Sequence, residues 1–149
     1  MKVGATFSTF DLSHAGCINM LAEVKKQCDY LICSVQIDST IDHSVRNKPV
    51  QSVVERYIQL RGCKYMDEIV PYTTEQDLED ILRSFHINVC IIGDEYATKM
   101  FTDRNYCGKK GIKLYFNKIE HYFSSRGLRK EVHEKKIDLI NKRKIKQNY

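Results

Sequence analysis

The chain has 149 residues, which fits a single domain, and 42% of them are hydrophobic, enough for a buried core. Charged residues make up 29%, and no stretch approaches the roughly 18 apolar residues that a membrane span needs, so we expect no membrane segment. Residues 1–7 resemble a strand and not a secretory leader, and the six cysteines lie mostly in apolar runs. Both features favour a cytoplasmic protein with reduced thiols.

The net charge of +5 is concentrated near the C-terminus. Residues 126–149 hold nine Lys or Arg and three Asp or Glu, a net charge of +6, so residues 1–125 carry −1. A charge run of this kind is usually a solvated face, and we therefore expect neither nucleic acid nor a membrane as a partner. We interpret residues 131–149 as a basic C-terminal helix or tail of the domain formed by residues 1–130.

Short β-rich runs alternate along the chain with segments of helical period. The predicted elements are a strand at 2–7, a helix at 18–24, a strand at 30–36, a helix at 53–60, a strand at 68–70, a helix at about 74–85, a strand at 89–92, room for a helix in 94–112, a strand at 113–116 and a last helix after Ser124 and Ser125.

This order predicts an α/β fold, a Rossmann-like parallel sheet of about five strands with helices on both faces. Thr73 and Gln76 fit a capping box at the start of the third helix. In doubly wound sheets ligands bind beyond the carboxyl ends of the strands, so the segments that follow each strand are the candidates for a site.

His14 and Gly16 stand where the first predicted strand gives way to the first helix. An imidazole in that position lies beside backbone N–H groups at the positive end of the helix, an arrangement that binds phosphate. A lone histidine at such a junction is more often a cap or a packing residue, so this residue alone leaves both roles open.

The stretch from Ser8 to Cys17, Ser-Thr-Phe-Asp-Leu-Ser-His-Ala-Gly-Cys, resembles the Ser/Gly-Thr-Phe-Asp-x-x-His-x-Gly-His signature of the cytidylyltransferase-like nucleotidyltransferases, except at its last position. Further motifs follow in that family's order, and they are Lys48-Pro49 with Glu55-Arg56, residues 65–71, Ile92-Gly93-Asp94 and residues 123–129. The resemblance covers about residues 1–130 and is closest to the small glycerol-3-phosphate cytidylyltransferase-like proteins.

The resemblance implies transfer of CMP from CTP to a small phosphorylated alcohol or sugar, with release of pyrophosphate. Mg²⁺ would accompany the triphosphate, ATP is the alternative nucleotide, and the expected assembly is a homodimer. Glycerol 3-phosphate is the default acceptor, with ethanolamine phosphate, choline phosphate and a sugar phosphate as alternatives. Catalysis of this kind consists of positioning and charge stabilisation.

The resemblance also implies roles for individual residues. His14, Lys48 and Arg126 would be catalytic groups that contact the phosphates, with Arg46 as a second cation of the loop that carries Lys48. The implied nucleotide-binding residues are Thr9, Phe10, Asp11, Gly16, Cys17, Asp94, Ser124, Ser125 and Arg129. Asp11 either contacts the nucleotide or orients His14 and its loop. Because no Cys-x-x-Cys pair occurs, we assign no structural metal.

Cys17 is the main departure from the family pattern, because it replaces the second histidine. A thiol is a weak donor, and near a helix N-terminus it can ionise and repel a triphosphate. Losing one preorganised donor costs about 3–4 kcal/mol, a factor of about a hundred to a thousand in rate. The alternative to an active enzyme is a degenerate nucleotide-binding protein with little or no turnover.

Two further departures lie near the last motif. Residues 118–122 stand where the family has a basic cluster, with Ile119 inside it and Lys118 or His121 as the candidates to compensate. Arg126 replaces a small hydroxyl residue, and it either adds a phosphate contact or blocks one.

Overall fold

The computed structural model describes residues 1–41, 44, 48–93, 104–118 and 124–147. Its elements in chain order are β1 (Val3–Ser8), α1 (Ala15–Lys25), β2 (Tyr30–Gln36), α2 (Val53–Arg61), β3 (Glu68–Tyr72), α3 (Glu75–Ser84), β4 (Val89–Gly93), α4 (Arg104–Lys110), β5 (Lys113–Asn117) and α5 (Ser125–Gln147). The five strands form one parallel sheet in the order β3-β2-β1-β4-β5. The predicted Rossmann-like α/β fold is confirmed.

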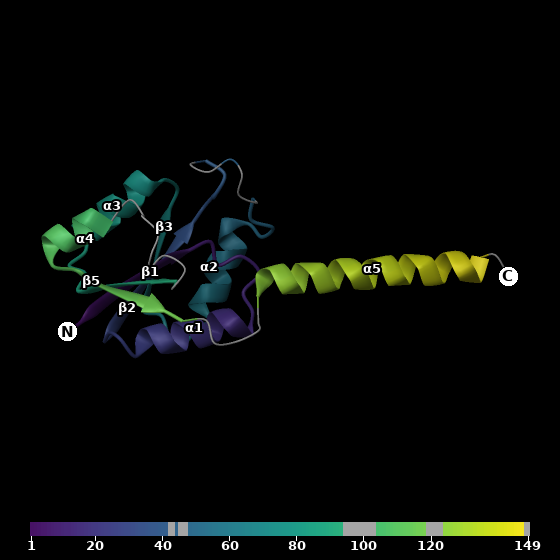
Figure 1. Ribbon diagram of the computed structural model, residues 1–149, viewed down its shortest axis with the longest axis horizontal. Helices are drawn as coiled ribbons and strands as arrows, with labels where there is room; N and C mark the ends of the chain where they lie inside the picture. The colour runs from purple at the N-terminus through teal and green to yellow at the C-terminus, as the bar shows by residue number, and fades with distance from the viewer. Residues whose placement is uncertain (42–43, 45–47, 94–103, 119–123, 148–149) are drawn as a thin grey trace.

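Helices cover both faces of this sheet (Figure 1). One core cluster joins Leu21 and Val24 of α1 and Leu60 of α2 to the sheet, and the other joins Leu82 of α3 and Cys107 of α4 to its opposite face. From β3 at one edge the chain returns across the sheet to β4, beside β1. The strand order therefore reverses next to β1, and ligands bind at this kind of switch point.

All six cysteines are free thiols, as predicted, and every one except Cys17 is buried. Burial raises the pKa of the Cys33 thiol, which keeps it protonated in the core. Within the described part of the chain, no group of three or more His, Cys, Asp or Glu side chains is placed to hold a metal ion.

Several element boundaries differ from the predicted ones by one to three residues. The first helix begins at Ala15, three residues early, because the His14 side chain caps it. The capping box predicted at Thr73 and Gln76 is wrong by one residue. Thr74 accepts from the Asp77 N–H at 3.2 Å, and the Asp77 carboxylate accepts from the Thr74 N–H at 3.0 Å. A carboxylate at the positive end of a helix is favoured over an amide.

The strand β3 also runs two residues further than predicted, through Pro71 to Tyr72. Proline lacks a backbone donor and is excluded from central strands, but β3 lies at the edge of the sheet. Only the hydrogen-bonding groups of β3 that face the neighbouring β2 therefore need partners in the sheet.

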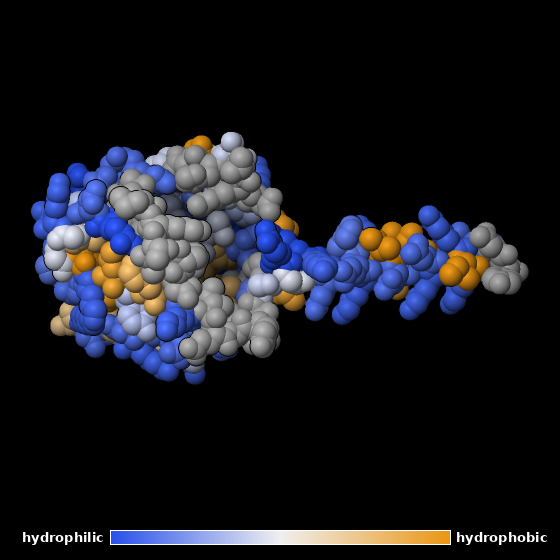
Figure 2. Space-filling model, viewed as in Figure 1, coloured by the Kyte–Doolittle hydropathy of each residue, from blue (hydrophilic) through white to orange (hydrophobic). Residues whose placement is uncertain are grey.

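The predicted last helix is present as α5, which projects away from the sheet (Figure 1). Its described side chains are exposed, except for the half-buried Arg129 near its start. Figure 2 shows a mainly hydrophilic surface along α5 with separate hydrophobic spots. Among the described helices, none has both the length and the apolar character needed to cross a bilayer.

Arg56 of α2 joins the segments at the carboxyl ends of β1 and β2, although its residue is only 1% exposed. Its Nη1 donates to the Thr9 carbonyl at 2.8 Å and also to the Gln36 carbonyl. Its Nη2 donates to the Ile37 carbonyl at 2.7 Å, and its Nε donates to the Gln51 carbonyl at 3.2 Å. One guanidinium therefore holds the chain after β1, the chain after β2 and the segment before α2.

We expect Arg56→Met to lower the free energy of unfolding by about 3–5 kcal/mol, because it leaves several buried carbonyls without a donor. Arg56→Lys should lower the free energy of unfolding by less than Arg56→Met does. It should still be less stable than the wild type, since one ammonium cannot reach the same set of carbonyls. Denaturant unfolding measures both changes. Arg61→Met on the exposed side of α2 is the control, with an expected change within about 0.5 kcal/mol. A loss for Arg56→Met as small as the control's would contradict the proposed role.

Gly4 in β1 lies directly against Cys28, so we expect Gly4→Ala to be destabilising. An added Cβ would meet the Cys28 Sγ at 2.6 Å and the Cys28 Cβ at 2.9 Å. Overpacking of this kind typically costs about 1–3 kcal/mol. Thermal unfolding tests the prediction against Gly108→Ala in α4, where an added Cβ meets nothing within 4 Å. There alanine should be neutral or stabilising by about 0.5–1 kcal/mol.

Candidate functional site

The loop between β1 and α1 holds two residues in a sparsely populated backbone conformation. Phe10 has φ 49° and Leu12 has φ 50°, and neither is a glycine. Such conformations cost roughly 1–3 kcal/mol each and persist where the surroundings enforce them. The Leu12 N–H donates to the Gln51 side-chain oxygen at 2.8 Å, and the Phe10 side chain packs in the core. The segment before α2 thus shapes this loop.

Asp11 lies between these two residues and binds two separate parts of the chain, the segment before α2 and the start of α5. Its carboxylate accepts from the backbone N–H groups of Val50 and Gln51, both at 2.9 Å, and from Arg129 of α5. Burial opposes the ionised form, but the two N–H groups and the Arg129 charge outweigh it and lower the pKa of Asp11. The sequence left two roles open for Asp11, a contact with the nucleotide or the orientation of His14 and its loop. These contacts match the second role.

His14 occupies the N-cap position of α1. Its Nδ1 accepts from the Gly16 N–H at 3.0 Å, and its carbonyl accepts from the Cys17 N–H at 3.0 Å. An accepting Nδ1 carries no proton, so the neutral imidazole has its proton on Nε2, and Nε2 is then a donor suited to a phosphate oxygen. The amides of Gly16 and Cys17, expected to be open to phosphate, are instead bonded to His14.

Cys17 is half-buried and lies in the first turn of α1, three residues after His14. The structure therefore places the substituted position of the motif beside the cap, at the same end of the helix. The side chain that would supply a second imidazole donor is here a thiol.

The start of α5 lies against the β1–α1 loop through Arg129, which donates to Asp11 across 118 positions of sequence. The Arg129 Nε is buried without a hydrogen-bond partner in the described chain. Ser124 acts as the helix cap, because its Oγ accepts from the Gly127 N–H at 2.9 Å. Arg126 is exposed, and the side chain of Ser125 lies outside the described part.

Two other predicted groups follow β2 and β5. Lys48 is exposed in the segment before α2, and its charge helps to lower the pKa of Asp38, after hydrogen bonds from the Thr40 hydroxyl and N–H. Lys118, just beyond β5, is also exposed. Four predicted positions lie outside the described residues, and they are Arg46, Asp94, Ile119 and His121.

Two predicted nucleotide-binding residues have other partners in this structure. The Thr9 carbonyl accepts from Arg56, and Phe10 is buried in the core cluster that includes Leu21 and Val24 of α1. A nucleotide contact by Phe10 is thus restricted to its backbone. The roles of both residues toward a nucleotide stay predictions.

Gln51 and Arg56 are the organising residues for which no role was predicted. The sequence pattern could have predicted that Arg56 is buried, because it lies four residues before the apolar Leu60 and therefore on the inward face of α2. A charged residue on a core-facing stripe indicates a buried network. Gln51 carries no comparable signal, since its contacts depend on how two distant loops meet.

The lowered pKa of Asp11 predicts a pH-dependent contribution to stability. Because the folded-state value lies below the unfolded one, the contribution is complete above the unfolded value of about 3.9 and is lost as the pH falls through the folded-state pKa. Asp11→Asn should therefore cost most near neutral pH and progressively less below about pH 4. The free energy of unfolding, measured once near neutral pH and once below about pH 4, tests this prediction. Asp138→Asn on exposed α5 is the control. An equal cost for Asp11→Asn at both values would contradict the prediction.

The chain is similar in sequence to known cytidylyltransferases and in fold to a solved structure. A profile described as cytidylyltransferase-like matches residues 5–142. Glycerol-3-phosphate cytidylyltransferase of Bacillus subtilis is 32% identical over 108 residues, covering 72% of this chain and 82% of that enzyme. Ethanolamine-phosphate cytidylyltransferase of Dictyostelium discoideum is 34% identical over 90 residues, which are 58% of this chain. The chain spans only 24% of the length of that second protein.

A solved structure shares the fold. The lipopolysaccharide core biosynthesis protein of Thermoplasma volcanium superimposes with a TM-score of 0.65, at 23% identity, over 83% of this chain and 99% of that one. This likeness concerns the fold alone. The family profile, however, extends over nearly the whole chain and includes the His14 motif, the α2 segment and the start of α5. The chain therefore belongs to the cytidylyltransferase-like family.

Proposed function

We propose that this protein transfers CMP from CTP to a small phosphorylated alcohol and releases pyrophosphate. The observation that carries the proposal is the state of His14, which caps α1 through Nδ1 and so keeps its proton on Nε2. This donor follows a loop that Asp11 ties to the segment before α2 and to the start of α5, at the switch point of the sheet. Such preorganised donors stabilise charge that develops on a transferring phosphoryl group.

In the proposed reaction, a phosphate oxygen of the acceptor attacks the α-phosphorus of CTP. A new P–O bond forms there, and the bond from the α-phosphorus to the bridging oxygen of the β-phosphate breaks, so pyrophosphate leaves. The step needs no covalent enzyme intermediate. We assign His14, Lys48 and Arg126 to the phosphates, with Mg²⁺ arriving on the triphosphate as part of the substrate.

Glycerol 3-phosphate is the first acceptor to test, and ethanolamine phosphate is the second. The support comes from the names of two relatives, a glycerol-3-phosphate and an ethanolamine-phosphate cytidylyltransferase. The former is similar to this chain over most of its own length, which favours its substrate. CTP is the proposed nucleotide and ATP the competitor to include in the same assay.

A second candidate function rests on Cys17. Its thiol lies in the first turn of α1, beside the donor that the reaction uses, and it replaces a strong donor by a weak one. On this reading the protein binds the nucleotide and turns it over slowly or not at all. The two candidates share a fold and a ligand, and they differ in rate alone.

Arg129 has a supporting role in the proposal. It was expected to bind phosphate, but its Nη2 is engaged by the buried Asp11. We assign it to holding the start of α5, and with it Ser124 and Arg126, against the β1–α1 loop. Arg126, in the first turn of the helix, is exposed, and it is the cation that we assign to a phosphate.

The decisive assay is pyrophosphate release from Mg·CTP and Mg·ATP with a panel of phosphorylated alcohols. We expect turnover by the wild type with CTP and loss of about a hundredfold or more in His14→Ala, since a preorganised donor is removed. Cys17→His should raise kcat by about a hundred- to a thousandfold by restoring one.

Cys17→Ser is the matched control, because it changes the sulfur atom without adding an imidazole. Turnover by Cys17→His alone would establish the nucleotide-binding candidate for the wild type. Nucleotide binding should be measured in parallel by calorimetry. No binding and no turnover in any of these variants would refute the proposed function.

A further inference from the structure

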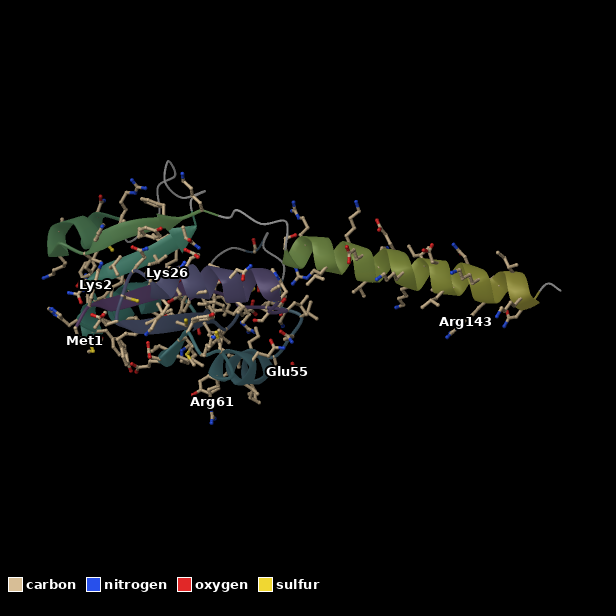
Figure 3. All side chains as sticks on the ribbon, turned by 90° about the horizontal axis from the view of Figure 1, so that it is seen from below. Met1, Lys2, Lys26, Glu55, Arg61 and Arg143 are labelled. Carbon is tan, nitrogen blue, oxygen red and sulfur yellow. The ribbon has the colours of Figure 1, made fainter. Side chains whose placement is uncertain are left out.

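The helix α5 is the longest helix in the described part of the chain, and most of it stands clear of the domain. Its 23 residues make it roughly 35 Å long. Arg129, near its start, pairs with Asp11, and the described side chains after Arg129 are exposed. Figure 3 shows Arg143, in the distal half of the helix, far from the sheet. The distal half therefore offers its whole circumference to a partner.

The acidic residues of α5 are offset by lysines of the same helix. Residues four positions apart are neighbours on a helix surface. The pairs at this spacing are Lys130 with Glu134, Glu131 with Lys135, and Asp138 with Lys142. In the first of them the ammonium nitrogen lies 3.9 Å from the carboxylate oxygen. The three acids also share one side of the helix, because they follow each other at intervals of three and four residues.

Four other cations in the distal half of α5 have no acidic residue three or four positions away. They are Lys136, Arg143, Lys144 and Lys146. At about 3.6 residues per turn these four lie within one half of the circumference, and the three acids lie in the other half. All four side chains are exposed. We call them the α5 basic side, and its charge is not offset by the helix itself.

We propose that the α5 basic side binds the phosphate backbone of a double-stranded nucleic acid. An α-helix with its side chains is about 10–12 Å wide, and the major groove of a duplex is about 12 Å wide. The four cations extend over ten residues, roughly 15 Å, and a duplex carries one phosphate charge per about 1.7 Å of its axis. The charge of the α5 basic side therefore has a matching density of opposite charge.

This proposal goes beyond the catalytic function and departs from the expectation drawn from the sequence. A charge run is usually a solvated face, and the sequence gave no sign of whether this one packs on the domain. In the structure the helix is continuous to Gln147 and its distal half is exposed. A rigid, projecting basic helix can enter a groove, whereas a frayed tail or a docked helix cannot.

A membrane surface fits α5 less well than a duplex does. A helix that lies in a lipid surface gathers its apolar residues on one face. In α5 the exposed Ile137 and Leu139 lie on nearly opposite sides, and the exposed Ile145 lies on a third. Figure 2 accordingly shows separate hydrophobic spots. Leu139 and Ile140 lie on the same side as Lys136 and Arg143, where base edges in a groove would cover them.

The α5 basic side is far enough from the candidate site to bind independently of it. Lys136 follows Arg129 by seven residues and Lys146 follows it by 17, which are roughly 10 and 25 Å along the helix. A duplex on the distal half therefore leaves the β1–α1 loop open to substrate. Binding of the duplex and turnover of CTP can be measured separately.

The first test is fluorescence anisotropy of a labelled DNA duplex of about 20 base pairs with the full chain, without nucleotide. Four neutralised phosphates predict a slope of about −3.6 for the logarithm of the association constant against the logarithm of the salt concentration. Affinity should thus fall about a hundredfold between about 50 mM and about 200 mM NaCl. No binding at the lower salt concentration, or binding insensitive to salt, overturns the proposal.

The second test removes the α5 basic side. The variant combines Lys136→Gln, Arg143→Gln, Lys144→Gln and Lys146→Gln. The matched control removes the same charge from exposed positions of the domain, and it combines Arg61→Gln, Lys109→Gln, Lys110→Gln and Lys113→Gln. We expect at least a hundredfold weaker binding for the variant and a change within about threefold for the control. Unchanged circular dichroism shows that α5 is still helical. Equal losses in both proteins overturn the assignment to α5.

The third test separates the duplex from a membrane. Vesicles of phosphatidylglycerol, at the same phosphate concentration as the duplex, should bind the full chain at least tenfold more weakly. Tighter binding to the vesicles overturns the proposal in favour of a lipid surface. Turnover of CTP by the variant of the α5 basic side should equal that of the wild type. A failure of the proposed catalytic function would therefore leave the duplex binding unchanged, and the two proposals fail separately.

Discussion

The buried guanidinium of Arg56 is the interaction on which the rest of the site depends. Where parallel strands end, their last backbone carbonyls have no hydrogen-bond partner in the sheet. Burying an unpaired carbonyl costs free energy. Arg56 collects these groups from Thr9, Gln36, Ile37 and Gln51 with one planar fork of donors. Burial lowers the pKa of this guanidinium, and the negative charges of Asp11 and Asp38 oppose that effect. The charges of these two carboxylates therefore stabilise the ion.

Asp11 is the second centre of the arrangement and has the opposite charge. Arg56 binds backbone carbonyls, whereas Asp11 binds backbone N–H groups of the segment before α2. Together they tie the β1–α1 loop to that segment through both kinds of backbone group, and this explains how Phe10 and Leu12 can remain at positive φ. His14 follows this loop directly, so the orientation of its imidazole depends on both charged residues. If His14 were held by α1 alone, only that helix would set the orientation of its imidazole.

The predictable parts of this protein are those determined by local pattern. The strands and the order of the helices follow from apolar periodicity, and the position of His14 follows from a motif placed between a strand and a helix. The contacts of Gln51 and Arg129 could not be predicted, since each joins segments far apart in the sequence. The shift of the capping box from Thr73 to Thr74 has a subtler cause, because two adjacent threonines offer similar caps and the partner three residues on decides between them. For Phe10, the motif did not reveal that its side chain belongs to the core.

The pairing of Arg129 with Asp11 sets an order in which the protein can be completed as it is synthesised. The strand β5 ends at Asn117, so the entire sheet has been made before Arg129 exists. A nascent chain at that stage can already bury both cores, while Asp11 has not yet formed its ion pair with Arg129. Domains fold as units during translation, from the N-terminus onward. The β1–α1 loop would therefore reach its final form after the scaffold does, when Arg129 emerges from the ribosome.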